Sequence, residues 1–354
     1  MPNDILTGAI DTLASRRDLS AEEAERVLGE IMHGEASETQ IAAVLIALRT
    51  KGETVAELAG LAQAMRTLAA PVVTGRDDLL DTAGTGGGRR TFNVSTTAAL
   101  IAAAAGCAVA KHGNRSATGL SGSADLLEAL GARIDLPPQA VAACIDQVGF
   151  GFMFAPAHHQ ATRFVVPVRR ELAVRTIFNF LGPLTNPAGA RRQLIGVSDP
   201  AMLDTIAGAL ARLGVDRALV VAGEDGLDEV SISSPTWVVE VNGEALTRHT
   251  LTPEQVGLQA VDEITELTEC EGGTPEHNAQ VTRAIFAGES GPRRDLAVIN
   301  AGAAIYAAGR GESLADGVTL AQHALDDGGA ADTLDRFVSA TLELAGEATG
   351  GPRR

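Results

Sequence analysis

The sequence is poor in cysteine and has no long apolar run. Its three cysteines are an odd number without the spacing of a metal site: Cys107, Cys144 and Cys270. A disulfide framework is therefore excluded, and a reducing compartment is expected. No stretch approaches the roughly 20 apolar residues of a membrane span, and the first residues lack the basic start and apolar run of a secretory signal. These absences predict a soluble protein of the cytoplasm that makes no membrane contact.

Positive charge is also scarce. Lysine and arginine total 28 against 45 aspartate and glutamate residues, which gives a formal net charge of −17. This balance argues against a broad surface for nucleic acid or anionic membrane, because neutralising phosphates requires clustered cations. An anionic ligand must then be held by a local site. The 354 residues, of which 45% are hydrophobic and 21% charged, have an ordinary globular composition and suffice for two or three domain-sized units.

Signals for helix starts dominate the first seventy residues. Three hydroxyl residues are each followed, three positions later, by glutamate or glutamine, which is the pattern of a capping box. The three pairs are Ser20 with Glu23, Ser37 with Gln40, and Thr54 with Glu57. Apolar residues recur at helical spacing after each pair. We expect three short helices in an all-helical unit, residues 1–70, that ends near Pro71.

From Leu79 onward, short apolar runs alternate with helical segments. The expected strands lie at 79–82, 107–111, 132–136, 151–155, 193–198, 218–223 and 237–241. The expected helices cover 95–106, 123–131, 138–149 and 201–214, and helices return between 276 and 346. This alternation predicts an α/β unit over 71–345 with a mainly parallel central sheet flanked by helices, followed by a frayed tail, 346–354. Such sheets bind ligands at the carboxyl ends of their strands.

A glycine-rich turn follows the first expected strand. Gly84, Gly86, Gly87 and Gly88 precede a helix that should begin near Ser95. Glycines let backbone amides converge on a ligand, and a helix N-terminus adds free N–H groups, so phosphate is the expected guest. The turn is neither a dinucleotide fingerprint, since an arginine replaces the third glycine, nor a P-loop, since no Gly-Lys-Ser or Gly-Lys-Thr follows. The alternative is a plain tight turn before a helix that Ser95 only caps.

The next strand end carries one of the only two lysines in the chain. This residue is Lys111, and the other is Lys51. A compact ammonium suits a phosphate met as a point charge. Ser121 to Ser123 then open another helix, which offers a second N-terminus able to bind an anion. The alternatives are a solvated surface charge for Lys111 and an ordinary helix cap for Ser121.

An arginine pair follows in the segment PVRRELAVRTIFNFLGPLTNPAG. Arg169 and Arg170 lie on an expected helix, and the fork of an arginine binds a planar carboxylate through two parallel hydrogen bonds. The alternative is a surface ion pair with Glu171 or another neighbour.

An acidic turn ends the expected strand at 218–223. Asp225, Asp228 and Glu229 are hard oxygen ligands of the kind that magnesium prefers. The alternative is a solvated acidic turn in an acidic protein. No Ser-His-Asp set and no zinc spacing stands out, and His158 and His159 are expected to be structural or surface residues.

Four segments in this order resemble the anthranilate phosphoribosyltransferases, which join anthranilate to phosphoribosyl pyrophosphate (PRPP) in tryptophan biosynthesis. They are GTGG with NVST, KHGNR with SGSAD, PVRRELAVRTIFNFLGPLTNPA, and DGLDE. The resemblance implies a magnesium-dependent glycosyltransferase that produces N-(5-phosphoribosyl)anthranilate and pyrophosphate. It also implies a small all-helical domain, joined by helices from about 165–185 and hinged to a larger α/β domain. The site would lie in the cleft, and the protein would form a homodimer through its helical domains.

The resemblance also implies roles for individual residues. PRPP would be held by the first two segments, through Gly84, Gly87, Gly88, Thr91, Asn93, Val94, Ser95, Thr96, Lys111, His112, Gly113, Asn114, Arg115, Ser116, Ala117, Thr118, Gly119 and Ser123. Asn114 and Arg169 would hold anthranilate, with Gly84 close to both substrates. Ser95 and Glu229 would ligate one magnesium ion, and Asp228 with Glu229 a second. No general base is named, because the aromatic amine is largely unprotonated at neutral pH.

Two features depart from the family pattern. The loop GTGGG stands where the family commonly has GTGGD, and it is one residue shorter. Thr118 and Gly119 stand where paired serines are common. Two other functions are alternatives. One is a pyrimidine nucleoside phosphorylase, in which the carboxylate-facing arginine would have no obvious role. The other is a non-catalytic nucleic-acid-binding relative, which the charge of −17 disfavours.

Overall fold

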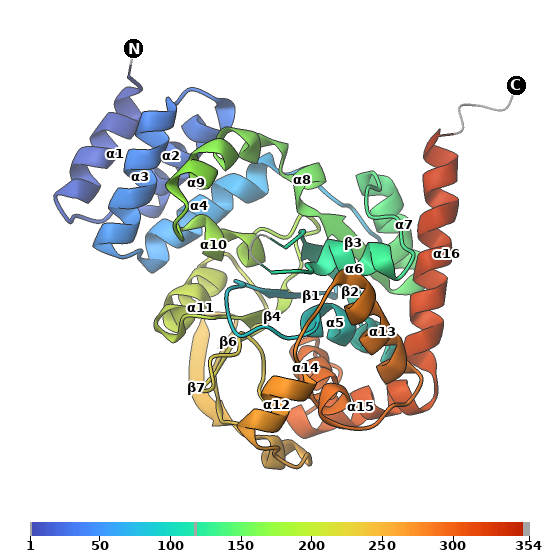
Figure 1. The fold of residues 1–354 in the computed structure, drawn as a ribbon. Helices are drawn as coiled ribbons and strands as arrows, with labels where there is room; N and C mark the ends of the chain where they lie inside the picture. Colours follow the sequence, from blue (N-terminus) through green and yellow to red (C-terminus); the bar gives the residue numbers. More distant parts are fainter. Residues whose placement is uncertain (1, 117–118, 350–354) are drawn as a thin grey trace, which may run out of the picture.

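The chain begins with a bundle of helices at one side of the molecule (Figure 1). The computed structural model describes residues 2–116 and 119–349, and its first helices are α1 (Asp4–Ala14), α2 (Ala21–His33), α3 (Glu38–Lys51) and α4 (Val55–Leu68). Ser20 and Thr54 make both bonds of a capping box, as predicted. At α3, the Ser37 side chain accepts from the backbone N–H of Gln40. The Gln40 side chain bonds the backbone of Asn3 and not that of Ser37, so the capping box is incomplete. The prediction of three helices missed α1, which Asn3 caps.

The larger part of the molecule is built on a seven-stranded sheet in the described residues, in the order β3-β2-β1-β4-β5-β6-β7. The strands are β1 (Leu79–Gly84), β2 (Ala108–Gly113), β3 (Phe150–Phe154), β4 (Arg192–Gly196), β5 (Arg217–Gly223), β6 (Thr236–Asn242) and β7 (Ala245–Leu251). Strands β1 to β5 pair in parallel, whereas β6 and β7 pair antiparallel. The expected α/β architecture with a mainly parallel sheet is therefore confirmed.

One predicted strand is absent, and one observed strand was not predicted. Residues 132–136 are not a strand, although Ile134 is buried as alternation would require. The backbone N–H of Arg133 donates to the Thr341 hydroxyl on the C-terminal helix, at 3.1 Å, rather than to a neighbouring strand. Strand β7 was missed because its side chains are polar and mostly exposed. Its signal was the Asn242-Gly243 dipeptide, which marks a hairpin turn.

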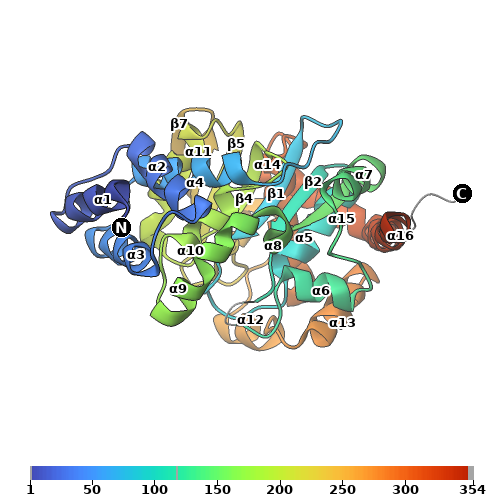
Figure 2. The same ribbon diagram turned by 90° about the horizontal axis from the view of Figure 1, so that it is seen from above.

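Helices cover both faces of the sheet (Figure 2). After the bundle they are α5 (Val94–Ala104), α6 (Ser123–Ala129), α7 (Pro138–Val148), α8 (Ala155–His158), η1 (Gln160–Phe164), α9 (Val166–Leu172), α10 (Phe178–Leu181), η2 (Gly182–Leu184), η3 (Pro200–Met202), α11 (Leu203–Arg212), η4 (Pro253–Val256), α12 (Glu263–Glu269), α13 (Pro275–Phe286), α14 (Pro292–Ala307), α15 (Leu314–Asp326) and α16 (Gly329–Thr349). Helices α5 and α14 pack on one face with α15 and α16 outside them, and α11 packs on the other face against α4.

Strand β5 divides the hydrophobic core into two parts. Leu219 and Val221 point into the core beneath α5 and α14, whereas Ala218, Val220 and Ala222 point into the core shared with the helical bundle. This alternation follows from the two-residue period of a strand. The bundle and the sheet are thus joined by continuous apolar packing, to which α9 and α10 also contribute through contacts with α3 and α4.

The C-terminal helix α16 runs to Thr349, past residue 346, where the tail was expected to begin. Over the described residues, no helix combines the length and the apolar character that crossing a membrane requires.

Candidate active site

The glycine-rich turn connects the carboxyl end of β1 to α5. Gly86 and Gly87 have φ angles of +65° and +87°, which residues with a side chain rarely adopt. The backbone N–H of Thr85 donates to Gly196 O at 2.8 Å, so the turn starts against the end of β4. Helix α5 begins at Val94, within one residue of the prediction, and Asn93 is its N-cap. The turn therefore places glycine backbone beside a helix N-terminus.

Asp228 lies directly beneath this turn. A Cβ atom at Gly88 would overlap the Asp228 carboxylate, and one at Gly84 would lie 3.2 Å from it. At Gly196, a Cβ would overlap the backbone carbonyl of Asp228. The Gly86 N–H also donates to the Asp228 carboxylate. The glycines are thus required for packing against Asp228, a reason that sequence analysis did not give.

Lys111 connects β2 to the start of α5. Its side chain is buried, and its Nζ donates to Thr82 O at 2.5 Å and to Thr82 Oγ1 at 3.2 Å, with Ser95 Oγ at 3.5 Å. Burial lowers the pKa of Lys111 to about 8, and the charges of Asp81 and Glu229 oppose this shift. The alternative of a solvated surface charge is excluded. The ammonium is a buried positive charge below the helix N-terminus.

Glu229 completes the cluster. Burial, and then repulsion by Asp228, raise the pKa of Glu229 to about 8, whereas Lys111 and a hydrogen bond from the Ser95 N–H act in the other direction. Burial also raises the pKa of Asp228. The structure therefore brings together Lys111, Ser95, Asp228 and Glu229 from three different strand ends, as the sequence predicted.

Asp81 is a buried acid that sequence analysis missed. It accepts hydrogen bonds from the His112 N–H at 3.0 Å and the Asn186 side chain at 2.7 Å. Burial raises its pKa to about 6, while the charge of Lys111 lowers it. The available signal was a single acid within the apolar run at 79–82. Asp81 ties the site to the segment that follows α10.

Asn93 links the first loop to the second. Its amide nitrogen donates to Ser121 O at 3.1 Å, and its oxygen accepts from Ser121 Oγ at 2.9 Å and from Asn278 at 2.8 Å. Helix α6 begins at Ser123, as expected. The two helix starts predicted to bind anions are therefore held side by side.

The KHGNR segment is only partly turned toward this cluster. The Arg115 guanidinium pairs with Asp125 at 2.8 Å and Glu128 at 2.5 Å, on α6. Asn114 is exposed, and its carbonyl accepts from Ala124 N. The expected ligands Ala117 and Thr118 lie outside the described residues.

The other predicted PRPP ligands occupy the same loops. Gly87, Thr91, Gly113, Ser116 and Ser123 are partly or fully accessible, and Val94 is buried. The Gly119 N–H donates to Ser116 Oγ at 2.7 Å. The buried Thr96 hydroxyl has no partner within the described chain.

Arg169 lies on α9, on the side of the helical bundle. Its guanidinium carbon is 5.4 Å from the centre of the Phe178 ring, and burial lowers its pKa. No carboxylate of the described residues pairs with Arg169, so the alternative of an ion pair with Glu171 is not supported. Its neighbour Arg170 is exposed.

Arg175 is a further cation that sequence analysis missed. Its Nη2 donates to Ser198 Oγ at 2.9 Å and to Gly86 O at 3.4 Å, so the guanidinium lies against the glycine-rich turn. It belongs to the same PVRRELAVRTIF segment as Arg169.

The donor atoms of the cluster suit magnesium. Asp228 and Glu229 supply carboxylates and Ser95 a hydroxyl, all hard oxygen ligands. Among residues 2–116 and 119–349, no three His, Cys, Asp or Glu side chains form a metal-binding group. A magnesium ion here would thus take further oxygens from water and from substrate, as magnesium commonly does.

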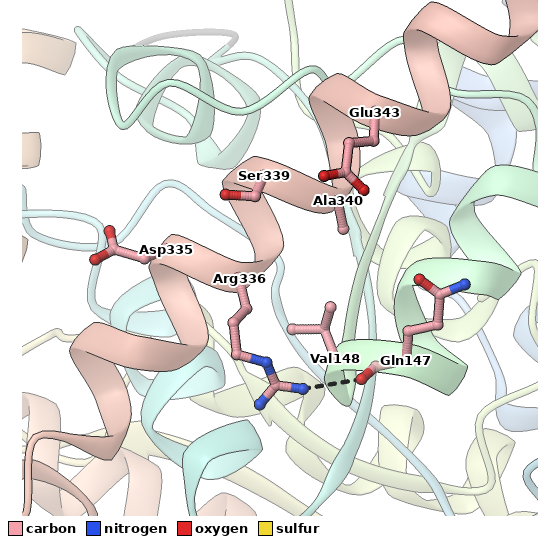
Figure 3. Close-up of a pocket in the computed structure, with 7 residues that line it drawn as sticks. All are labelled: Gln147, Val148, Asp335, Arg336, Ser339, Ala340 and Glu343. Carbon is pink, nitrogen blue, oxygen red and sulfur yellow. Dashed lines mark hydrogen bonds between the residues drawn. The ribbon is translucent and has the colours of Figure 1, made fainter.

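One surface depression lies elsewhere. Figure 3 shows it between α7 and α16, where Arg336 donates to Gln147 O at 2.9 Å. It shares no residue with the cluster at the strand ends.

Comparison with known proteins decides the family. The helical-bundle domain model of a glycosyl transferase family matches residues 7–69, and the α/β domain model of that family matches residues 76–331. Anthranilate phosphoribosyltransferase from Symbiobacterium thermophilum is 50% identical over 336 residues, which cover 95% of this chain and 97% of that protein. The chain belongs to the anthranilate phosphoribosyltransferase family. The resemblance based on four segments is confirmed.

Solved structures of the family have the same fold. The crystal structure of the Thermus thermophilus anthranilate phosphoribosyltransferase has a TM-score of 0.89 and 47% identity, and covers 94% of this chain and 99% of that one. The Saccharomyces cerevisiae family member, in complex with PRPP and Mg, has a TM-score of 0.85 and 26% identity, and covers 96% of this chain and 98% of that one. The yeast protein has also been solved with 4-fluoroanthranilate.

Proposed function

We propose that the protein transfers the 5-phosphoribosyl group of PRPP to the amine of anthranilate, giving N-(5-phosphoribosyl)anthranilate and pyrophosphate for tryptophan biosynthesis. One observation carries this proposal: the glycine-rich turn folds onto Asp228, beside Glu229 and the Ser95–Lys111 pair. Backbone amides, a helix N-terminus, a buried cation and two acids thus meet at one edge of the sheet. This combination suits a phosphate-rich substrate that carries magnesium.

PRPP binds in the proposal along the two linked loops. The turn at Gly84, Gly87 and Gly88 offers amides to the pyrophosphate, and the start of α5 adds the N–H groups of its first turn. The Lys111 ammonium contributes positive charge beneath the start of α5, because it is buried there and donates to Ser95 Oγ. A buried charge of this kind is screened less by solvent than a surface lysine would be.

The metal assignment follows the same residues. Ser95 and Glu229 would hold one magnesium ion, and Asp228 with Glu229 a second. When bound, magnesium supplies positive charge that neutralises the departing pyrophosphate. Lys111 and the amides of the turn contribute to that neutralisation from the protein side.

Anthranilate is placed by Arg169 and Asn114, with Gly84 close to both substrates. The guanidinium of Arg169, which pairs with no carboxylate of the described residues, can clamp the anthranilate carboxylate through two hydrogen bonds. The chemistry at the ribose carbon develops oxocarbenium character, as in glycoside hydrolysis. The protein therefore needs to position the amine and to stabilise the leaving group, and no residue has to act as general base.

The proposed assembly is a homodimer through the helical bundles. Ile5 on α1 and Ile46 on α3 support it, because both apolar side chains are exposed on that bundle. Sedimentation velocity at several protein concentrations tests it.

The activity is tested by following the loss of anthranilate fluorescence after PRPP is added, with and without magnesium. We expect loss of fluorescence only when both PRPP and magnesium are present. Release of thymine from thymidine and phosphate would favour a nucleoside phosphorylase instead. Retention of nucleic acid on a filter at low salt would favour a nucleic-acid-binding protein.

A further inference from the structure

Arg89 lies in the glycine-rich turn and is enclosed by two other segments. Its backbone N–H donates to Gly226 O at 3.2 Å. Its Nη1 is 3.3 Å from Asp225 Oδ2 and donates to Asp225 O at 3.3 Å, and its Nη2 is 3.7 Å from Glu266 Oε2 on α12. The side chain is 18% exposed. Arg89 thus joins the turn after β1 to the loop after β5 and to α12.

Three acids face Arg89: the exposed Glu263, 3.9 Å from Nη1, and two buried acids that are fixed independently of it. Asp225 accepts hydrogen bonds from Ser231 Oγ at 2.7 Å and Ser233 Oγ at 3.1 Å. Glu266 accepts from Ser233 Oγ at 2.6 Å and from Ile232 N at 3.1 Å. The side chains of Asp225 and Glu266 are 2% and 0% exposed. Arg89 therefore joins the glycine-rich turn to two acids that have hydrogen-bond partners of their own.

The contact lies next to the residues that hold substrate and metal. Arg89 follows Gly88, which packs against the Asp228 carboxylate. Asp225 precedes Asp228 by three residues in the same loop after β5. Ordering a run of glycines costs more conformational entropy than ordering other residues. A side chain that bridges to buried acids supplies an interaction to offset that cost.

We propose that Arg89 is a positioning residue that, together with Asp225 and Glu266, sets the separation between the glycine-rich turn (85–93) and the acidic loop (224–230). Arg89 touches neither substrate in this assignment. It keeps the amides for pyrophosphate and the carboxylates for magnesium at matching positions, so its loss weakens binding of magnesium-bound PRPP. This inference rests on the proposed function, which places PRPP and magnesium at these loops.

The fork of an arginine is suited to this role. Its nitrogens point in fixed directions and reach two carboxylates at once, whereas an ammonium is a single point of charge. Removing the cation would also leave two buried acids facing each other without compensation. Arg89→Lys should therefore preserve the binding of magnesium-bound PRPP only in part, and Arg89→Met should preserve less of it.

The test compares Arg89→Met with Arg90→Met, because Arg90 is the adjacent arginine and is exposed. For Arg89→Met we expect the KM for PRPP and the half-saturating magnesium concentration to rise by about 10–100-fold, the range found when partners behind metal ligands are removed. The KM for anthranilate should stay within about twofold, since Arg169 lies on α9. Arg90→Met should behave as wild type.

A second readout needs no ligand. Hydrogen–deuterium exchange of peptides covering 84–92 and 224–230 should be faster in unliganded Arg89→Met than in wild type and Arg90→Met, with unchanged exchange in the helical bundle. If Arg89→Met does not fold, Glu266→Gln provides the test, with the same direction and a smaller rise in the KM for PRPP. Wild-type exchange together with a wild-type KM for PRPP in Arg89→Met would overturn the proposal.

Asp228→Asn with Glu229→Gln serves as the reference. If that double variant keeps wild-type magnesium dependence, the metal assignment itself fails. If it loses magnesium dependence while Arg89→Met binds PRPP as wild type does, only the role of Arg89 is refuted.

Discussion

Arg169 and Arg170 are neighbours on α9, yet their environments differ. Arg169 is partly buried against Phe178 and has no ion pair within the described residues, whereas Arg170 is exposed. A guanidinium held on an aromatic ring without a carboxylate partner is ready to bind one from a ligand. The two residues therefore form a natural pair of test and control.

We expect Arg169→Ala to raise the KM for anthranilate by about 10–100-fold, which corresponds to losing a charged hydrogen-bonded contact. The KM for PRPP should change little. Steady-state kinetics with each substrate varied in turn measures both. An equal effect of Arg170→Ala on the KM for anthranilate would show that Arg169 does not clamp the carboxylate.

Sequence analysis predicted some site residues better than others. The convergence of Lys111, Ser95, Asp228 and Glu229 could be predicted, because Lys111 lies near the end of a parallel strand, Ser95 opens the helix after another, and the two acids follow a third. Asp81 and Arg175 could not, because their roles depend on partners distant in the sequence, Asn186 for one and Ser198 for the other. Arg115 is expected to bind PRPP, and in this structure its guanidinium pairs with Asp125 and Glu128 on α6.

At the scale of elements, the ends of β4 and β5 meet where a side chain has no room. Gly196 closes β4, and a Cβ there would overlap the backbone carbonyl of Asp228. Backbone atoms cannot move aside as the end of a flexible side chain can. Gly182, at the start of η2, has no atom within 4 Å of the corresponding position, and its φ of −49° is open to any residue.

We expect Gly196→Ala to reduce the free energy of unfolding by roughly 1–3 kcal/mol or more, because overpacked positions force the backbone to shift. It should also lower activity by displacing Asp228. Gly182→Ala should leave both close to wild type. Urea unfolding measures the first effect, and equal stabilities of the two variants would contradict the packing argument.

Local signals predicted most elements of the fold, and the exceptions have physical causes. Helices α2 and α4 begin where their capping boxes stand. Residues 132–136 alternate like a strand, but the N–H of Arg133 bonds Thr341, 208 positions along the chain. Local alternation indicates burial of one side of a segment, and it cannot show whether a neighbouring strand is present.

At the scale of the whole molecule, buried histidines connect the bundle to the sheet. His112 lies near the end of β2, and the centre of its ring is 5.0 Å from that of His159, which follows α8. Burial lowers the pKa of His112 to about 3 and that of His159 to about 4. Both values are below the 6.5 of an unperturbed histidine, so the unfolded chain binds protons more readily than the folded one. Their contribution to stability is complete above about pH 6.5 and is lost as the pH falls toward 4.

We therefore expect the two histidines to lower the free energy of unfolding as the pH falls from about 7.5 to about 5. His159→Gln, which can still donate to Thr185 O, should lose less over this interval, by on the order of 2 kcal/mol. The raised pKa values of Asp81 and Glu229 increase stability as the pH falls. Both acids are present in wild type and in His159→Gln, so their contribution cancels when the two proteins are compared. Urea unfolding at both pH values is the measurement. A variant whose stability falls as steeply as that of wild type would contradict the prediction.

The central claim is that loops from separate strands of the sheet form one site for magnesium-bound PRPP. The most direct test is calorimetric titration of PRPP, over a range of magnesium concentrations, into wild type and into Asp228→Asn with Glu229→Gln. These substitutions keep the size of both side chains and remove their charge. We predict that magnesium tightens PRPP binding in wild type and has little effect in the double variant. Equal magnesium dependence in both proteins would contradict the account.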